Sequence, residues 1–384
     1  MTQRYDAIIC GGGPAGSAAA LALARRGHAV AVLDRARFPR PKLCGGLLTW
    51  KTVRLLETAL GETVDCLARA GAVIHRSDRY VIRTFDKPLA EGALPFPFHF
   101  VDRAAFDNHL LRKAEAEGAS VIQGVEAASV DTEKGVVMAV DGRTWAGDWI
   151  IGADGANSVV RKAFAGVDRE RMRRLMAPAL EIALPAAEFR PVACPELYVG
   201  FLDAGYGWVF PHGEAVVAGI CGLRREKINF SAMFKEYLEF LGVDPAAVRP
   251  FRGHPLPYGN YLEEPVEGRA LLAGDAAGLV EPLFGEGIFF SLCSGWYAGE
   301  AVAHGLARRG DPGPVYLRRL HRQILPELRA SDRLRWLIFR AMRHTGPGSL
   351  GFFVNAAARP LAEMVHGMRS YAWLRRKRWD FLEG

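Results

Sequence analysis

The sequence of 384 residues predicts an α/β protein, α+β in overall balance, with a nucleotide-binding domain, an inserted antiparallel-sheet domain and a helical C-terminal region. Three observations predict this fold class. An apolar strand, a glycine-rich turn and a helix follow one another within residues 7–26, as they do at the start of a parallel sheet. Strand-like segments with one helix, at 231–241, fill residues 166–267 and favour an antiparallel sheet. From residue 308 onward the pattern is helical and rich in arginine.

The glycine-rich turn is a G-x-G-x-x-G motif at residues 11–16, placed between a strand and a helix. Gly11 permits the tight turn, Gly13 lets the backbone approach a pyrophosphate, and Gly16 lets the helix pack on the sheet. The N-terminus of the helix offers free N–H groups and a positive dipole end to phosphates. Asp34 ends the next strand at the distance expected for an acid that binds a ribose hydroxyl. The motif therefore predicts a Rossmann-like domain for a dinucleotide cofactor.

The composition excludes several classes of protein. The six cysteines are scattered without metal-ligand spacing, so we expect no metal site and a reducing, cytoplasmic location. No apolar run is long enough to span a membrane, and the N-terminal apolar residues belong to the nucleotide fold rather than to a signal peptide. The net charge is +7, and residues 308–384 contribute 16 basic and 6 acidic residues to it. This asymmetry predicts either an anionic partner surface or a solvated helical face.

The order of the elements predicts that the nucleotide-binding domain is discontinuous. A second β-α-β-like unit covers residues 101–122, and a hairpin turns at Asp141-Gly142. A buried strand at 270–275 and a long helix at 285–308 return to the first domain after the insertion. The expected boundaries are 1–70, 98–165 and 268–330 for the nucleotide-binding domain, 71–97 and 166–267 for the substrate-binding domain, and 331–384 for the basic helical region.

Three motifs in this order resemble those of the para-hydroxybenzoate hydroxylase-type flavoproteins. They are the glycine motif at 11–16, the segment Gly152–Ser158 with Arg161, and the segment Gly274–Gly278 followed by Pro282 and Gly285–Ile288. The resemblance implies non-covalently bound FAD. It also implies that Asp275 lies near the ribityl chain, that Asp154 and Gly155 lie near the pyrophosphate, and that the helix opening at Gly285–Ile288 faces the flavin pyrimidine ring. The expected cofactor-binding residues are Gly11, Gly13, Pro14, Ala15, Gly16, Asp34, Arg35, Cys44, Gly45, Arg103, Asp154, Gly155, Gly274, Asp275, Gly285, Gly287 and Ile288.

Two further segments are similar to the geranylgeranyl reductase branch of these flavoproteins. One is the turn Pro41–Gly46 (PKLCGG), and the other is Tyr206–Glu214 (YGWVFPHGE), where the branch has Y-x-W-x-F-P-K-G-E. His212 replaces the lysine, which puts in doubt any role of that charge in choosing a substrate headgroup. In this branch the cysteine of the turn, here Cys44, borders the active site. We predict that Cys44 either donates a proton to an alkene or only lines the cavity.

Tyr206, Trp208 and Phe210 alternate along one predicted strand, so their side chains share one face. Beside a flavin, this face makes an apolar slot for a prenyl chain; without a flavin, it packs on a helix of its own domain. His99, His254 and His321 have no partner that the sequence identifies, and we assign them to surface or core positions.

These observations predict an FAD-dependent reductase of isoprenoid double bonds in a prenylated lipid, quinone or chlorophyll-type substrate. NADPH or a ferredoxin-type protein would supply electrons, and the basic C-terminal region would dock on an anionic membrane surface. One alternative is an aromatic monooxygenase on the same fold. A second is a non-catalytic flavin-binding regulator at a membrane surface or on nucleic acid, although the aromatic residues among the C-terminal cations favour a membrane, and we expect no nucleic acid.

Overall fold

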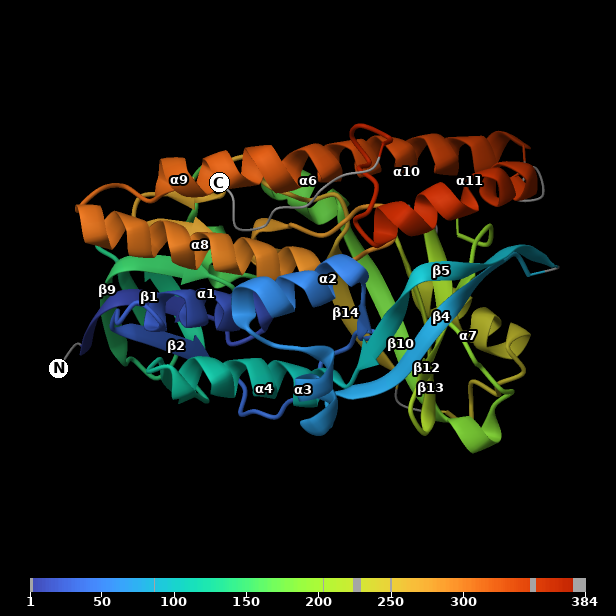
Figure 1. Cartoon of the computed structure of the whole chain (residues 1–384), viewed down its shortest axis with the longest axis horizontal. Helices are drawn as coiled ribbons and strands as arrows, with labels where there is room; N and C mark the ends of the chain where they lie inside the picture. Colours follow the sequence, from blue (N-terminus) through green and yellow to red (C-terminus); the bar gives the residue numbers. More distant parts are fainter. Residues whose placement is uncertain are drawn as a thin grey trace.

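The computed structural model describes residues 3–85, 87–202, 204–223, 229–248, 251–345 and 350–375, without the side chains of 343, 345 and 350–356. Two sheets of eight strands each organise this part of the chain. Figure 1 shows how the helices lie around them. The fold class expected from the sequence is confirmed, with parallel strands in one sheet and mainly antiparallel strands in the other. Within these ranges no helix combines the length and the hydrophobicity that crossing a bilayer requires.

The first sheet has the strand order β15-β16-β9-β1-β2-β6, and the hairpin β7-β8 is attached to β9. β1 pairs in parallel with both β2 and β9, so the strand before the glycine motif lies in the middle of the sheet. The strands are β1 (Gln3–Cys10), β2 (Val30–Asp34), β6 (Ser120–Gln123), β7 (Ala127–Asp131), β8 (Val136–Ala139), β9 (Thr144–Gly152), β15 (Val266–Glu267) and β16 (Ala270–Leu272).

Helices α1 (Pro14–Ala24) and α8 (Ile288–Arg308) lie together on this sheet, and small residues allow their close approach. Every residue of α1 is buried. A Cβ atom on Gly295 would lie 2.1 Å from the carbonyl oxygen of Ala15, and one on Gly299 would lie 2.6 Å from that of Ala19. These two glycines, four residues apart, therefore form the face of α8 that contacts the α1 backbone. The other helices of this half are α2 (Trp50–Leu55), α3 (Val64–Arg69), α4 (Arg103–Ala116) and α5 (Val159–Ala163).

The second sheet has the order β14-β10-β13-β12-β11-β4-β5-β3. Its long hairpin, β4 with β5, was not predicted as strands. Helix α7 (Phe230–Phe240) covers one face, where Phe234 and Tyr237 pack on Val209 and Ile220. The strands are β3 (Leu47–Leu48), β4 (Val73–Arg83), β5 (Pro88–Val101), β10 (Met176–Pro185), β11 (Glu196–Tyr198), β12 (Gly205–His212), β13 (Ala215–Gly222) and β14 (Arg252–Pro257).

The C-terminal region is helical, as expected. Its helices α9 (Gly313–Arg319), α10 (Leu325–Thr345) and α11 (Leu350–Val365) run along one side of the molecule in Figure 1, and α6 (Arg169–Arg174) lies near them. α11 packs against β5, so this helix reaches the inserted sheet. The domain boundaries stay a prediction. The strand pairing differs from them at three places, because β3 and all of β5 belong to the second sheet and β15 belongs to the first.

Candidate functional site

One cavity of about 940 Å³ extends from the glycine motif to the second sheet and α11. Most of the expected site residues line it, although they come from segments spread over the whole chain. Gly16 and Gly274 do not line it. A Cβ atom on Gly16 would lie 1.8 Å from the carbonyl oxygen of Gly11, so Gly16 serves the close packing behind the turn. Gly274 donates its N–H to Ser294 Oγ and is likewise buried. The expected residues on the wall are Gly11, Gly13, Pro14, Ala15, Asp34, Arg35, Cys44, Gly45, Arg103, Asp154, Gly155, Tyr206, Trp208, Phe210, Asp275, Gly285, Gly287 and Ile288.

The nucleotide end of the cavity is built around the N-terminus of α1. Gly13 is the N-cap and no side chain caps the helix, so the first N–H groups stay available. Gly11 has φ +102, and a Cβ there would lie 2.3 Å from the carbonyl oxygen of Ala153, so only glycine fits. The carboxylate of Asp34 accepts the N–H groups of Gly12 at 2.7 Å and Ala36 at 2.8 Å, which fixes its position at the wall. Arg35 lies at the rim with an exposed side chain.

Asp154 contributes a buried carboxyl group to the same end. Its Oδ2 accepts the N–H of Val159 at 2.6 Å, whereas Oδ1 is buried with no hydrogen-bond partner in the described part of the chain. Burial raises the pKa of Asp154, and the hydrogen bonds from Ser158 and Val159 oppose this rise. An acceptor of this kind, at the wall and without a partner, matches a cofactor that donates a hydrogen bond.

The opposite wall is the N-terminus of α8, which also has a glycine N-cap, Gly287, and no side-chain cap. The loop before it is tied down from two sides. Tyr206 donates its O–H to the carbonyl oxygen of Phe284, and Glu286 binds Lys51 Nζ at 2.5 Å and Thr49 Oγ1 at 2.7 Å. The positive dipole end of α8 is thereby held at the cavity, where it stabilises negative charge.

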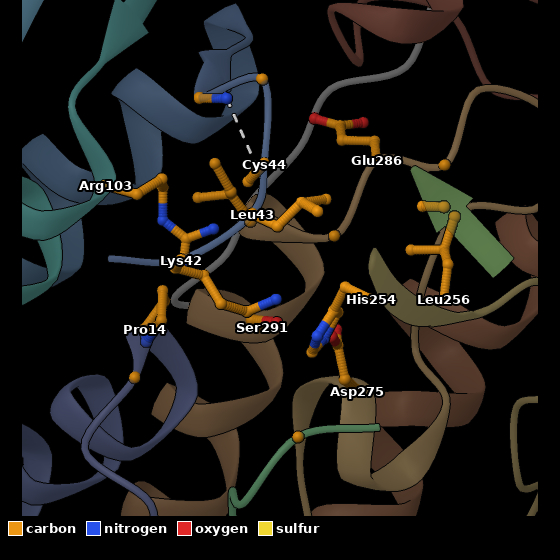
Figure 2. A pocket seen from close by; sticks show the side chains of 18 of the residues that line it. Pro14, Lys42, Leu43, Cys44, Arg103, His254, Leu256, Asp275, Glu286 and Ser291 are labelled. Atoms are coloured by element: carbon orange, nitrogen blue, oxygen red, sulfur yellow. Dashed lines mark hydrogen bonds between the residues drawn. The ribbon is translucent and has the colours of Figure 1, made fainter. Parts of the chain in front are cut away.

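The Cys44 turn forms the centre of the site in Figure 2. The Cys44 thiol accepts the N–H of Gly46 at 3.4 Å and lies within reach of the Arg103 guanidinium. Arg103 is itself held by two hydrogen bonds of 2.9 Å to Asp107. Burial by itself would lower the pKa of Arg103, but Asp107 and Cys44 raise it, so the group stays a cation beside the thiol. A Cβ on Gly45 would lie 2.5 Å from the Phe210 ring, which shows how closely the turn packs on β12.

His254 is a cavity residue whose place was not expected from the sequence, whereas Lys42 belongs to the turn that the sequence singled out. His254 was assigned to a surface or core position, but it lines the cavity from β14 and lies beside Asp275 in Figure 2. Its Nε2 is buried and has no hydrogen-bond partner among the described residues. Burial and the cations Lys42 and Arg103 lower the pKa of His254 to about 3, so the imidazole is neutral at physiological pH. Burial also lowers the pKa of Lys42, which nearby Asp275 partly offsets.

The other end of the cavity is apolar. Tyr206, Trp208 and Phe210 share the face of β12 that lines it, with ring centroids 6.1 and 6.4 Å apart in sequence order. The helix α7 covers the opposite face of the sheet, so these three side chains do not pack on it. His212, at the lysine position of the motif, does not line the cavity, and burial lowers its pKa.

α11 closes this apolar end, which the sequence analysis did not predict. The residues Ala358, Leu361, Ala362 and Val365 line the cavity with the i, i+3, i+4, i+7 spacing of one helical face. This spacing is visible in the sequence and indicates an apolar face on the helix, but it does not indicate which part of the protein that face contacts.

Two residues of the segment that was expected to dock on a membrane, Met364 and Tyr371, are instead buried in the protein.

The residues present fit FAD. Two uncapped helix N-termini and the unpartnered Asp154 Oδ1 and His254 Nε2 face one cavity, and the cavity continues beyond them into apolar surroundings. The family model for the FAD binding domain matches residues 4–312. Fold and site together define an FAD-dependent oxidoreductase.

The relatives narrow this class. Geranylgeranyl diphosphate reductase from Rhodobacter capsulatus is 33% identical over 327 residues, which cover 83% of this chain and 79% of that protein. A menaquinone reductase from Mycolicibacterium smegmatis is 30% identical, with 79% of this chain and 78% of that protein covered. The chain belongs to the geranylgeranyl reductase family of FAD-dependent oxidoreductases.

Solved structures agree with this fold. A geranylgeranyl bacteriochlorophyll reductase-like protein from Thermoplasma acidophilum has a TM-score of 0.72 at 21% identity, with 97% of this chain and 94% of that chain covered. A probable FAD-dependent monooxygenase from Pseudomonas aeruginosa has a TM-score of 0.69 at 19% identity, with 91% of this chain and 100% of that chain covered. At these identities the likeness shows the fold alone.

Proposed function

We propose that this protein uses FAD to saturate double bonds in the prenyl chain of a lipid, a quinone or a chlorophyll-type molecule. One observation carries the proposal: a single cavity joins a nucleotide-binding end to an apolar end, and the Cys44 turn lines it and packs on Phe210 of the apolar end. The names of the relatives support it, since they include reductases of geranylgeranyl diphosphate and of menaquinone.

Bound FAD would supply a hydride for one alkene carbon, and the other carbon needs a proton. The apolar walls from β12 and α11 hold the chain and exclude water, which an isolated alkene requires because it has no polar group to orient it. The N-terminus of α8 favours negative charge at its end of the cavity. Cys44, which lines the cavity beside Phe210 through its neighbour Gly45, is one candidate proton donor, and an ordered water is the other.

An anaerobic half-reaction tests this function. The purified yellow protein is reduced with dithionite and mixed with a geranylgeranyl-bearing lipid or menaquinone in detergent, while flavin absorbance is followed. We expect reoxidation without oxygen and a product heavier by two hydrogens. A flavin that stays reduced until oxygen enters, and then hydroxylates an aromatic compound, contradicts the proposal and supports a monooxygenase.

The electron donor is a separate part of the proposal. The sequence has one G-x-G-x-x-G unit, and FAD accounts for it, so we propose that NADPH binds transiently or that a ferredoxin-type protein reduces the flavin. Rapid mixing of the oxidised protein with NADPH, and in parallel with reduced ferredoxin, identifies the donor by which of them bleaches the flavin within seconds.

We also propose that the C-terminal region docks on an anionic lipid surface. Trp373 and Leu374 are 66% and 64% exposed, and Arg375 follows them. Ser370 and Tyr371 are bound to the buried Glu327, so a truncation at residue 370 would also remove contacts of the fold. The double variant Trp373→Ser/Leu374→Ser removes mainly exposed apolar surface and leaves the hydrogen bonds of Ser370 and Tyr371 to Glu327 in place.

Cosedimentation with vesicles tests the docking proposal. We expect the double variant to bind less to vesicles containing phosphatidylglycerol, and the wild-type protein to bind less as salt increases. Val140→Ser, at an apolar side chain that is 70% exposed on another part of the molecule, is the matched control. Equal vesicle binding by the wild-type protein and the double variant contradicts docking through these residues.

A further inference from the structure

The loop between β2 and the Cys44 turn places a guanidinium at the start of the glycine-motif helix. Arg40 lines the cavity, and its side chain is 18% exposed. A Cβ atom on Gly13 would lie 3.5 Å from Arg40 Nη2. Gly13 is the N-cap of α1, which has no side-chain cap. The guanidinium therefore lies beside the free N–H groups of a helix N-terminus, a place that favours an anion.

An aromatic ring and a carboxylate hold Arg40 in this position. Its guanidinium lies 4.7 Å from the ring centroid of Phe38, and that ring packs on the glycine motif, since a Cβ on Gly12 would lie 3.4 Å from its Cζ. The N–H of Phe38 donates to Gln123 Oε1 at 2.7 Å, which ties the loop to β6. Arg40 Nη2 also lies 3.3 Å from Oδ2 of Asp107. The protein alone thus orients the guanidinium, which lowers the entropic cost of binding a ligand there.

The positive charges around Asp107 outnumber its one negative charge. Asp107 is fully buried and accepts two hydrogen bonds of 2.9 Å from Arg103, in addition to its ion pair with Arg40. Two cations thus share one carboxylate, and the positive end of α1 adds to their field. Arg40 itself donates no hydrogen bond within the described part of the chain. Its N–H groups at the cavity wall are therefore available to an anionic ligand.

Three acids also line this end of the cavity, and among the described residues none of them is paired with Arg40. Asp34 accepts two backbone N–H groups, which fixes its carboxylate. Glu126 lies at the rim, 3.9 Å from Arg35. Burial raises the pKa of Asp154, which favours the neutral form of its carboxyl group. Arg40 is thus a cation with donors directed at a cavity rather than a member of a closed ion pair.

We propose that Arg40 binds the pyrophosphate of FAD together with the N-terminus of α1. A guanidinium donates two parallel hydrogen bonds to one phosphate group, and its charge compensates part of the negative charge of the ligand. The glycine motif supplies backbone N–H groups and a helix dipole, and Arg40 adds a full positive charge from the loop before the Cys44 turn. Because the partner is the cofactor, this role does not depend on which substrate is reduced.

Release of FAD from the full-length protein tests this role. The holoprotein is diluted, and the fluorescence of free flavin at equilibrium gives the Kd. We expect Arg40→Met to raise the Kd for FAD at least about tenfold, as the loss of a charge-assisted hydrogen bond does. Arg40→Lys keeps the charge but not the two parallel donors, so it should recover part of the affinity. Arg37→Met is the matched control, since Arg37 is exposed on the same loop and does not line the cavity; it should release FAD as the wild-type protein does.

Two competitors show which part of the cofactor Arg40 contacts. ADP carries a pyrophosphate without a flavin, and riboflavin carries a flavin without a phosphate. In Arg40→Met the inhibition constant of ADP against FAD binding should rise by a factor similar to that for FAD, whereas the constant of riboflavin should not change. Added NaCl should weaken FAD binding more in the wild-type protein than in Arg40→Met, because salt screens a charge that the variant lacks.

Equal release of FAD by the wild-type protein and Arg40→Met would overturn the assignment. A similar loss of riboflavin affinity would also overturn it, because the substitution would then disturb the cavity as a whole. So would a variant that retains FAD but needs much more NADPH for reduction, which would assign the guanidinium to the pyrophosphate of an electron donor. If no prenyl compound reoxidises the flavin, the proposed function fails, while these binding constants still report on Arg40.

Discussion

The ion pair between Lys51 and Glu286 offers the sharpest test of how the cavity is held together. The lysine Nζ lies 2.5 Å from the carboxylate, and the two side chains are only 2% and 9% exposed. The ammonium group also lies over the rings of Phe289 and Phe290, 5.1 Å from each centroid. In Lys51→Met the carboxylate keeps one hydrogen bond, from Thr49, and no counter-charge.

Removing one partner of a buried pair costs about 3–5 kcal/mol, because the remaining charge is left in low-dielectric surroundings. Unfolding entropy is about 2.1 cal/mol/K per residue, so for 384 residues unfolding together this loss lowers Tm by about 4–6 °C. Glu286 belongs to the loop before α8, so weaker FAD binding should accompany the loss.

Denaturant unfolding with FAD in excess, followed by flavin and tryptophan fluorescence, measures the cost. Lys51→Met/Glu286→Gln removes both charges and should return to within about 1–2 kcal/mol of the wild-type protein. Arg4→Met is the matched control, since its 2.7 Å pair with Asp148 is exposed and should contribute less than about 1 kcal/mol. Strictly additive effects of the Lys51 and Glu286 substitutions would refute the reasoning.

Three more predictions follow from the geometry. Gly45→Ala puts a methyl group against the Phe210 ring; we expect at least about a tenfold slower anaerobic reoxidation with FAD still bound, and an unchanged rate would contradict this. Burial, Lys51 and His99 lower the pKa of His366 to about 3, so this group binds more protons in the unfolded state below pH 6.5, and it should lower the unfolding free energy by about 1 kcal/mol per pH unit between pH 6.5 and 5. His366→Gln should reduce the slope of the unfolding free energy against pH by that amount in urea unfolding, while the contribution of His254, whose pKa is also lowered to about 3, remains. Ala362→Trp narrows the apolar end, so activity should fall more for a twenty-carbon prenyl chain than for a ten-carbon one, while FAD content stays the same.

Much of the nucleotide half could be predicted because its signals are local. A glycine motif between a strand and a helix specifies backbone conformation and a free helix N-terminus within a dozen residues, so Gly11 and Gly13 needed no tertiary information. The alternation of Tyr206, Trp208 and Phe210 specified a shared face, but not whether a helix or a cavity lay against it. In the structure α7 covers the other face of the sheet, so the three aromatic side chains face the cavity.

Residues whose role depends on distant neighbours escaped the sequence analysis. His254 looked unpartnered because the groups around it, Lys42 and Arg103, come from more than 150 positions earlier in the chain. Trp208 lies over Gly219 of the neighbouring strand, a contact that depends on the register between β12 and β13. The apolar spacing on α11 was visible, but a helical stripe gives no information about its contact.

The sequence by itself determined the cofactor class and the family, because glycine turns, helix N-termini and strand alternation are encoded within short segments. The tertiary structure decided which titratable groups meet at the cavity and what closes its apolar end. Burial and charge interactions set pKa values, and both depend on the packing of segments as far apart as the Cys44 turn and α11.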